Sequence, residues 1–203
     1  MNRPDQKRRV NMIDSTQIDS LRAALGKRSI VMVGMMGCGK TAIGRRLAQR
    51  LELPFVDADD EIEKAAGKSI PEIFEDHGEE HFREGERKVI LRLLQNGPQV
   101  LATGGGAFMN AETREEIRHR GISIWLKAEL PVLLRRVGRR DSRPLLRGDN
   151  PEEIMKRLLK ERSPFYAKAD LVADSRDEPH DQIVAQIITL LLNSRILEDK
   201  PRV

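Results

Sequence analysis

The chain has 203 residues, 39% of them hydrophobic, and a formal net charge of +4, so it is long enough to bury the core of one domain. It contains no apolar run of the roughly 18 residues that a membrane span needs, and the polar, basic residues 1–10 lack the apolar segment of a secretory signal. A single cysteine, Cys38, excludes an internal disulfide framework and predicts a cytoplasmic protein. Aromatic residues make up only 3%, which favours small anionic ligands over single-stranded nucleic acid as partners of the basic excess.

The first 28 residues form an extension ahead of the main domain. Residues 1–14 are polar and without pattern, which predicts a disordered tail. Ile18, Leu21 and Leu25 then fall on one face of a short predicted helix, which starts at Ser15 and stops at Gly26. We expect this helix to contribute packing and not chemistry.

A phosphate-binding motif follows the first predicted strand, residues 29–33. The motif Gly34-x4-Gly39-Lys40-Thr41 lies between that apolar strand and an amphipathic helix over residues 42–51, the context that a P-loop requires. Lys40 would reach the outer phosphates, and the Thr41 hydroxyl would bind Mg²⁺. A glycine turn that binds nothing is the alternative, which the strand before it and the helix after it disfavour. The predicted ATP-binding residues here are Gly37, Cys38, Gly39, Lys40, Thr41 and Ala42.

The second predicted strand begins near Leu53 and runs into a cluster of carboxylates. If the strand persists to Asp59, Asp57 and Asp59 share a side, which would place one carboxylate near a metal and the other at a substrate. The alternative is that these acids only cap the next helix, residues 60–66, with Asp60 as its N-cap.

Two helices are predicted between this strand and the next. Ser69 and Glu72 fit a capping box for a helix that stops near Gly78, and a second helix runs over residues 79–96. Arg83 stands among acidic residues, so its first interpretation is a solvated surface ion pair. His77 and His81 lack a set of metal partners and are expected at the surface.

The third predicted strand, residues 100–103, ends in the run Gly104-Gly105-Gly106. Three glycines in a row permit close approach of the backbone to a ligand, or they simply meet the need of a loop for positive φ angles. A helix over 110–119 and a strand over 122–126 follow, with Trp125 expected in the core.

Residues 133–148 carry six arginines, and Gly138 and Gly148 flank the segment that contains Pro144. In a P-loop protein such a loop is best interpreted as a lid that closes on phosphates, although a solvated basic face or a nucleic-acid patch has the same composition.

The rest of the domain is expected to hold a helix over residues 150–161, a last strand over 169–173 and a helix over 179–192, followed by a frayed tail over 193–203. The alternation of strands and helices predicts an α/β fold with a five-stranded parallel sheet covered on both faces.

Taken in order, the motifs of residues 29–192 resemble those of the shikimate kinases, which belong to the nucleoside-monophosphate-kinase-like P-loop group. The ordered set is Gly34-x4-Gly39-Lys40-Thr41, Asp57-x-Asp59, Phe82-Arg83, Gly104-Gly105-Gly106, Arg143-Pro144-Leu145-Leu146 and Arg162-x-Pro164-x-Tyr166. The resemblance implies transfer of the γ-phosphoryl group of MgATP to the 3-hydroxyl of shikimate, in aromatic amino-acid biosynthesis. It also implies one three-layer domain with sheet order 2-3-1-4-5, a substrate-binding region at about 57–86 and a lid at about 138–150. We expect a monomer without nucleic-acid or membrane partners.

For the acceptor, the resemblance implies that Arg83 and Arg162 hold the shikimate carboxylate, a task that suits the planar guanidinium fork. Asp59 would accept hydrogen bonds from the ring hydroxyls and take the proton of the attacking one. The backbone at Gly104, Gly105 and Gly106 would close over the substrate.

For the donor, the resemblance implies that Lys40 and Arg143 stabilise charge on the transferring group and that Arg136 lies against the adenine. Residues 100–103 lack the acid that many P-loop NTPases use for Mg²⁺, and the resemblance assigns the metal to Thr41 directly and to Asp57 through water. Many relatives place a basic residue near the adenine after the last strand, whereas residues 175–179 of this chain read Ser-Arg-Asp-Glu-Pro. Which residue borders the adenine on that side stays open.

Three other functions compete with this one. Another small-molecule kinase of the same fold, gluconate-type or nucleotide-type, is disfavoured by two carboxylates and two arginines that suit a hydroxylated carboxylic acid. A nucleic-acid-binding protein that uses ATP as a switch would need the arginine loop as a polyanion site. A catalytically inactive relative would more naturally have lost Lys40 or Asp59, and both are present.

Overall fold

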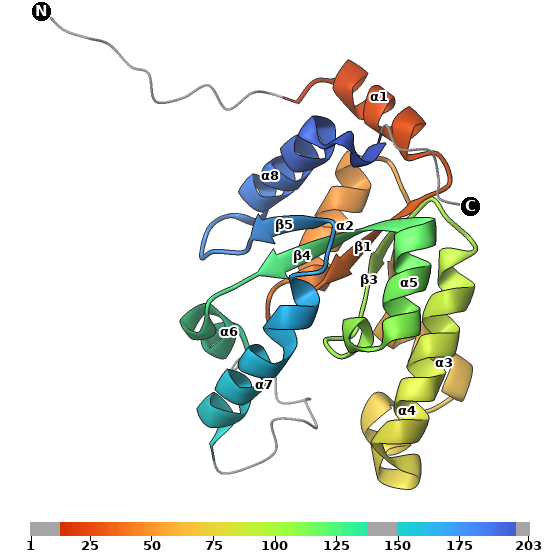
Figure 1. Ribbon diagram of the computed structural model, residues 1–203, viewed down its shortest axis with the longest axis vertical. Helices are drawn as coiled ribbons and strands as arrows, with labels where there is room; N and C mark the ends of the chain where they lie inside the picture. The colour runs from red at the N-terminus through yellow and green to blue at the C-terminus, as the bar shows by residue number, and fades with distance from the viewer. Residues whose placement is uncertain (1–12, 138–149, 198–203) are drawn as a thin grey trace, which may run out of the picture.

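The computed structural model describes residues 13–137 and 150–197, and a parallel sheet of five strands lies at its centre (Figure 1). The strands are β1 (Ser29–Val33), β2 (Phe55–Asp57), β3 (Val100–Ala102), β4 (Gly121–Lys127) and β5 (Leu171–Asp174). Their order is β2-β3-β1-β4-β5, and every neighbouring pair is parallel. The predicted sheet and its order are confirmed.

Helices cover both faces of this sheet. They are α1 (Ser15–Leu25), α2 (Lys40–Arg50), α3 (Ala58–Ala66), α4 (Ile70–Leu94), α5 (Ala111–Arg120), α6 (Leu130–Val137), α7 (Pro151–Tyr166) and α8 (His180–Asn193), with the 3₁₀ turns η1 (Ala107–Met109) and η3 (Arg195–Leu197). Helices α2 and α8 pack side by side on one face with α1 against α8, while α4 and α5 pack together on the other (Figure 1). The three-layer arrangement is therefore as predicted.

None of the helices in the described ranges combines the length and the apolar character that a membrane crossing requires.

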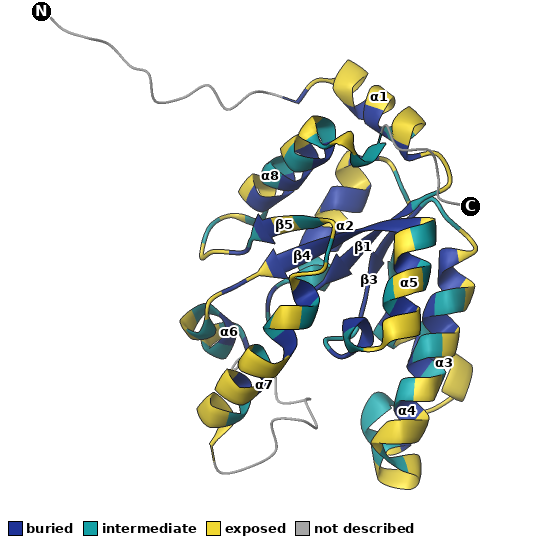
Figure 2. Cartoon of the chain, in the orientation of Figure 1, coloured by how far each residue is buried: buried dark blue, intermediate teal, exposed yellow. Residues whose placement is uncertain are grey.

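The sheet forms the core because its central strands, β1, β3 and β4, are buried on both sides. All five residues of β1 are buried, and Trp125 on β4 is 8% exposed, which confirms its predicted place in the core. In Figure 2, β1, β3 and most of β4 carry the buried colour, β5 is only partly buried, and the helices are exposed along their outer surfaces. A strand covered on both faces needs a continuous apolar run, which explains the sequence of β1.

The register of the three central strands aligns their carboxyl ends. Met32 of β1 is level with Ala102 of β3, and Asp57 of β2 is level with Ala102 from the other side. The P-loop leaves β1 just beyond Met32, so the end of β2 and the P-loop meet at the same edge of the sheet.

The prediction that Asp57 and Asp59 share one side of a strand is wrong. Strand β2 ends at Asp57, and Asp59 lies in the first turn of α3. Asp57 is the N-cap of this helix, since its Oδ1 accepts the Asp59 N–H at 3.1 Å, so the prediction of Asp60 as the cap is also wrong. The chain turns from strand to helix at once because the Asp57 carboxylate satisfies a free N–H of the first turn.

Helix α4 contains the predicted break and the predicted cap. Gly78 has φ 78° and ψ 177°, outside the helical region, and the Ser69–Glu72 capping box is present. His77 and His81 are exposed on either side of this break, with ring centroids 4.7 Å apart.

Two helices in the second half of the chain differ from the prediction. Helix α6 lies just before the predicted lid, in residues for which no helix was predicted, and it forms because Leu133 and Val137 bury an apolar face. Helix α7 continues past the predicted end at Glu161 and through Pro164, so that Arg162 lies within the helix.

The last strand, β5, starts and ends later than predicted. Residues 138–149 of the predicted lid, which include Arg143, lie outside the described residues.

Hydrogen bonds connect the residue just before β1 to η3, the last element of the described chain. Arg28 donates from Nη1 to the Ile196 carbonyl at 2.8 Å and from Nη2 to the Leu197 carbonyl at 3.3 Å. The prediction of a frayed tail is therefore wrong for η3. Helix α1 is confirmed, with Gly26 as its C-cap at φ 59°, and Leu21 is among the residues that it buries.

Leu21→Ala should lower the free energy of unfolding by about 2–5 kcal/mol, because it opens a cavity where a side chain is now 2% exposed. The control, Ser20→Ala, changes the exposed face of α1 and should alter stability only slightly. Urea denaturation followed by circular dichroism measures both. An unchanged midpoint for Leu21→Ala would show that α1 does not stabilise the domain.

Candidate active site

A cavity of about 870 Å³ opens at the carboxyl edge of the sheet. Figure 1 shows this edge with α3 and α4 on one side and α6 and α7 on the other. The cavity brings together most of the predicted site residues: Gly37, Gly39, Lys40, Thr41, Ala42, Asp57, Asp59, Arg83, Gly104, Gly105, Gly106, Arg136 and Arg162. Cys38 is fully buried and does not line the cavity, so only its backbone can contribute to ligand binding.

The P-loop needs its glycines for backbone conformation and for packing. Gly37 and Gly39 have φ angles of 82° and 101°, which residues with a side chain rarely adopt. A Cβ at Gly37 would also stand 2.7 Å from Cγ2 of Val137, so α6 packs directly on the loop.

Lys40 at the start of α2 is held over the loop by two carbonyls. Its Nζ donates to the Gly34 oxygen at 2.8 Å and to the Met35 oxygen at 3.0 Å. The ammonium is therefore placed at the mouth of the loop, beside the N-terminus of a helix, which is where a phosphate chain would bind.

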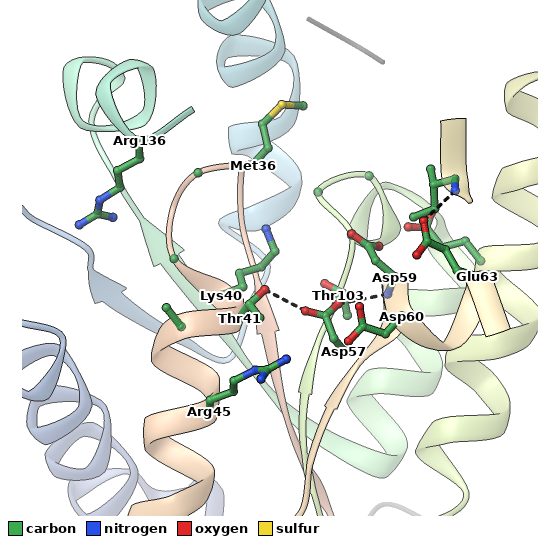
Figure 3. Close-up of a pocket in the computed structure, with 18 of the residues that line it drawn as sticks. Met36, Lys40, Thr41, Arg45, Asp57, Asp59, Asp60, Glu63, Thr103 and Arg136 are labelled. Carbon is green, nitrogen blue, oxygen red and sulfur yellow. Dashed lines mark hydrogen bonds between the residues drawn. The ribbon is translucent and has the colours of Figure 1, made fainter. Parts of the chain in front are cut away.

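Thr41 and Asp57 form the part of the site that fits a metal ion. The Thr41 hydroxyl donates to Asp57 Oδ2 at 2.8 Å, and Figure 3 shows Asp57 reaching across to Thr41 from the end of β2. Mg²⁺ takes oxygen ligands and keeps several waters, so one hydroxyl and one nearby carboxylate suit it. Within the described residues, no group of three or more His, Cys, Asp or Glu side chains is arranged to hold a metal, which is compatible with so sparse a protein contribution.

The far end of the cavity contains a buried ion pair. Arg83 Nη1 donates to Glu86 Oε2 at 2.8 Å, and its Nη2 donates to the exposed Glu79 at 3.0 Å. Interpreting Arg83 as a solvated surface pair is therefore incomplete, because the Glu86 side chain is only 3% exposed. Burial raises the pKa of Glu86, and the charge of Arg83 offsets only part of that rise.

Glu86 is the site residue that the sequence analysis missed. It follows Phe82 by one helical turn and precedes Val89 and Ile90, so it occupies the apolar stripe of α4. A charged residue in such a stripe is the signal that could have identified it, because buried carboxylates need a partner.

Two buried atoms at this end have no hydrogen-bond partner among the described residues. They are Nη1 of Arg162, a residue that is 9% exposed, and Oε1 of Glu86. An unsatisfied buried donor is costly, and a buried guanidinium especially so. A ligand with an acceptor group would relieve this cost, which indicates a carboxylate or another anion at Arg162.

The glycine run of residues 104–106 passes between these charged groups. A Cβ at Gly104 would collide with the Glu86 carboxylate and lie 3.0 Å from Asp59 Oδ1, and one at Gly106 would collide with the Arg83 guanidinium. None of the three glycines has a positive φ, so the need of a loop for positive φ angles does not explain the run. The neighbouring side chains leave no space for a Cβ at Gly104 or Gly106, and close approach to a ligand stays a prediction.

The opposite end of the cavity lies between α6 and the segment after β5. Arg136 of α6 lies there, on the other side of the P-loop from Asp57 (Figure 3). Arg136 donates to Ser175 Oγ at 2.9 Å and to the Arg176 carbonyl at 2.7 Å, and Ser175 donates to the Cys38 carbonyl at 2.7 Å. The cavity lining here also includes Asp177, Glu178 and His180. Burial, together with the charges of nearby arginines, lowers the pKa of His180, which favours a neutral ring.

Comparisons with known proteins agree with this geometry. The family model described as shikimate kinase matches residues 36–192. A shikimate kinase of Bradyrhizobium diazoefficiens is 63% identical over 169 residues, covering 83% of this chain and 82% of the relative. One of Rhodopseudomonas palustris is 57% identical over 177 residues, covering 87% of each.

Solved structures give the same result. The shikimate kinase from Acinetobacter baumannii in complex with shikimate has a TM-score of 0.81 at 39% identity, covering 85% of this chain and 97% of that one. A gluconokinase from Sinorhizobium meliloti, 20% identical with a TM-score of 0.58 and covering 85% of this chain and 94% of that one, shares the fold alone. This chain belongs to the shikimate kinase family, whose members are ATP-dependent kinases that phosphorylate shikimate.

Proposed function

We propose that the cavity at the carboxyl edge of the sheet is where this chain transfers the γ-phosphoryl group of ATP to the 3-hydroxyl of shikimate. One observation carries the proposal: a P-loop whose Thr41 contacts Asp57 shares a single cavity with Asp59 and with Arg162, whose buried Nη1 has no hydrogen-bond partner among the described residues. A phosphate donor and a carboxylic acid acceptor would thus lie in one cavity.

At the donor end, phosphate oxygens would replace the Gly34 and Met35 carbonyls as the partners of Lys40. Thr41 would hold Mg²⁺ directly and Asp57 would do so through water; the bound metal would neutralise charge on the phosphates. Since the acceptor occupies the Arg162 end, the nucleoside extends toward Arg136, which would lie against the adenine. Arg143, from the lid, would add a second cation at the transferring group.

At the acceptor end, the substrate carboxylate would bind to Arg162 Nη1 and Arg83, with Glu86 keeping Arg83 in place. Asp59 would accept a hydrogen bond from the 3-hydroxyl and take its proton as the oxygen attacks the γ-phosphorus. The backbone of residues 104–106 would close over the ring. Each group acts from a fixed position, which is how positioning lowers a barrier to phosphoryl transfer.

We also infer that the enzyme acts as a monomer in the cytoplasm. One chain supplies the groups assigned above to both substrates, so this arrangement requires no second copy. The single cysteine, Cys38, fits a reducing compartment.

The direct test is a coupled ADP-release assay with shikimate, quinate, gluconate and a nucleoside monophosphate as acceptors. We expect turnover with shikimate to exceed that with the other acceptors by far, since two arginines and Asp59 match a hydroxylated carboxylic acid. Faster turnover with gluconate or with the nucleotide would contradict the proposed substrate.

Asp59→Asn should lower kcat by at least about 100-fold, because an amide cannot take the proton of the attacking hydroxyl. The affinity for ATP, measured by isothermal titration calorimetry, should stay within about twofold, since Asp59 is placed at the acceptor. Asp19→Asn is the matched control, because Asp19 is exposed on α1 and does not line the cavity. Wild-type turnover by Asp59→Asn would remove Asp59 from the mechanism.

Arg162→Lys should raise the shikimate KM by about 10- to 100-fold, because a single ammonium cannot reproduce two parallel hydrogen bonds to a carboxylate. Arg157→Lys, at an exposed position on the same helix, is the control and should leave the KM unchanged. Steady-state kinetics at saturating ATP measures both variants. An unchanged KM for Arg162→Lys would mean that another residue binds the carboxylate.

A further inference from the structure

Tyr166 ends α7 inside the protein, directly behind the proposed acceptor site. Its side chain is fully buried, and its hydroxyl donates a hydrogen bond to the Gly105 carbonyl. Burial raises the pKa of this hydroxyl well above its usual value, so the proton needed for the bond stays in place throughout the neutral and mildly alkaline range.

Tyr166 lies close to two loops that line the cavity, the P-loop and the glycine run of residues 104–106. Its hydroxyl lies 3.7 Å from the Met35 sulfur in the P-loop. Arg162 precedes it by one turn of the same helix, and the Arg162 charge acts on the Tyr166 hydroxyl against the effect of burial. A Cβ built on Gly105 would stand 3.6 Å from Arg162 Nη1 and 3.4 Å from the Met36 nitrogen. The Gly105 peptide is therefore placed between the P-loop, Arg162 and Tyr166.

This hydrogen bond has a directional consequence. The Gly105 carbonyl and the Gly106 N–H belong to one planar trans peptide, so they point in opposite directions. A donor that holds the carbonyl on the Tyr166 side also directs the N–H of Gly106 away from Tyr166. Both glycines line the cavity, so the orientation of this peptide affects what the cavity presents to a ligand.

We propose that Tyr166 is a positioning residue for the acceptor site: its hydroxyl fixes the Gly105–Gly106 peptide beside Arg162, so that backbone and guanidinium together receive the carboxylic acid. The proposal rests on the acceptor site described under the proposed function. Tyr166 touches no substrate itself and acts through Gly105 and Arg162.

A purely structural role is the alternative, because the ring packs 5.9 Å from the ring of Trp125, centroid to centroid. Tyr166→Phe separates the two roles, since it keeps the ring and removes only the hydroxyl. Loss of packing lowers stability and the folded fraction, which reduces kcat alone. Loss of positioning weakens shikimate binding, which raises the KM.

For Tyr166→Phe we expect the shikimate KM to rise about tenfold, the effect of one buried hydrogen bond, with the kcat and the ATP KM within about threefold of wild type. Ser123→Ala is the matched control: it removes another buried hydroxyl, which donates to Asp170 at 2.6 Å and does not line the cavity. It should lower the melting temperature without raising the shikimate KM. Steady-state kinetics and thermal unfolding are measured on all three proteins.

A double-mutant cycle with Arg162→Lys supplies a second readout. If Tyr166 acts through the site that Arg162 forms, the KM increase in the double variant should be clearly smaller than the product of the two single increases. A multiplicative result, or a Tyr166→Phe enzyme whose whole loss lies in kcat, overturns the positioning role. Wild-type enzyme that fails to phosphorylate shikimate would instead overturn the proposed function, which keeps the two failures distinct.

Discussion

The parallel register of the three central strands is the constraint on which the site depends. Met32, Ala102 and Asp57 lie level with one another, so the P-loop, the glycine run and the β2 carboxylate all begin at one edge. This alignment places the Thr41 hydroxyl 2.8 Å from Asp57 Oδ2. The helices between the strands cover the sheet on both faces, and this burial drives the alignment. Packing at the centre of the molecule thus sets the geometry at its edge.

Charge burial distinguishes the acceptor end from the rest of the cavity. Glu86 is buried against Arg83, while Arg162 keeps one buried nitrogen without a partner among the described residues. Such groups reduce the stability of the ligand-free protein, because desolvation is only partly offset by pairing. A carboxylate that enters the cavity would restore the missing contacts, so the same cost favours binding. The buried charges at this end therefore lower the stability of the ligand-free protein and favour the binding of an anion.

Features that depend on local sequence could be predicted, and features that depend on distant contacts could not. The P-loop and the break at Gly78 follow from residue type and spacing, and the strand order followed from the family resemblance; the structure confirms both the break and the order. Glu86 was missed although it lies in the apolar stripe of α4, because its pairing with Arg83 appears only in the fold. Whether β2 would persist to Asp59 was left as a condition, and it does not, because Asp57 caps α3 and ends the strand. Helix α6 was not predicted, because the arginines drew attention in its sequence while its stability comes from packing of Leu133 and Val137.

The contact between Arg28 and η3 bears on how the domain is completed during synthesis. Arg28 immediately precedes β1, yet its acceptors are the carbonyls of Ile196 and Leu197, 168 and 169 residues later. A nascent chain cannot form these bonds until that segment has left the ribosome. The central strand must also wait for β3 and β4 before it has neighbours. Contacts of such high sequence separation slow folding, so the domain is expected to reach its native state late in translation and largely as one unit.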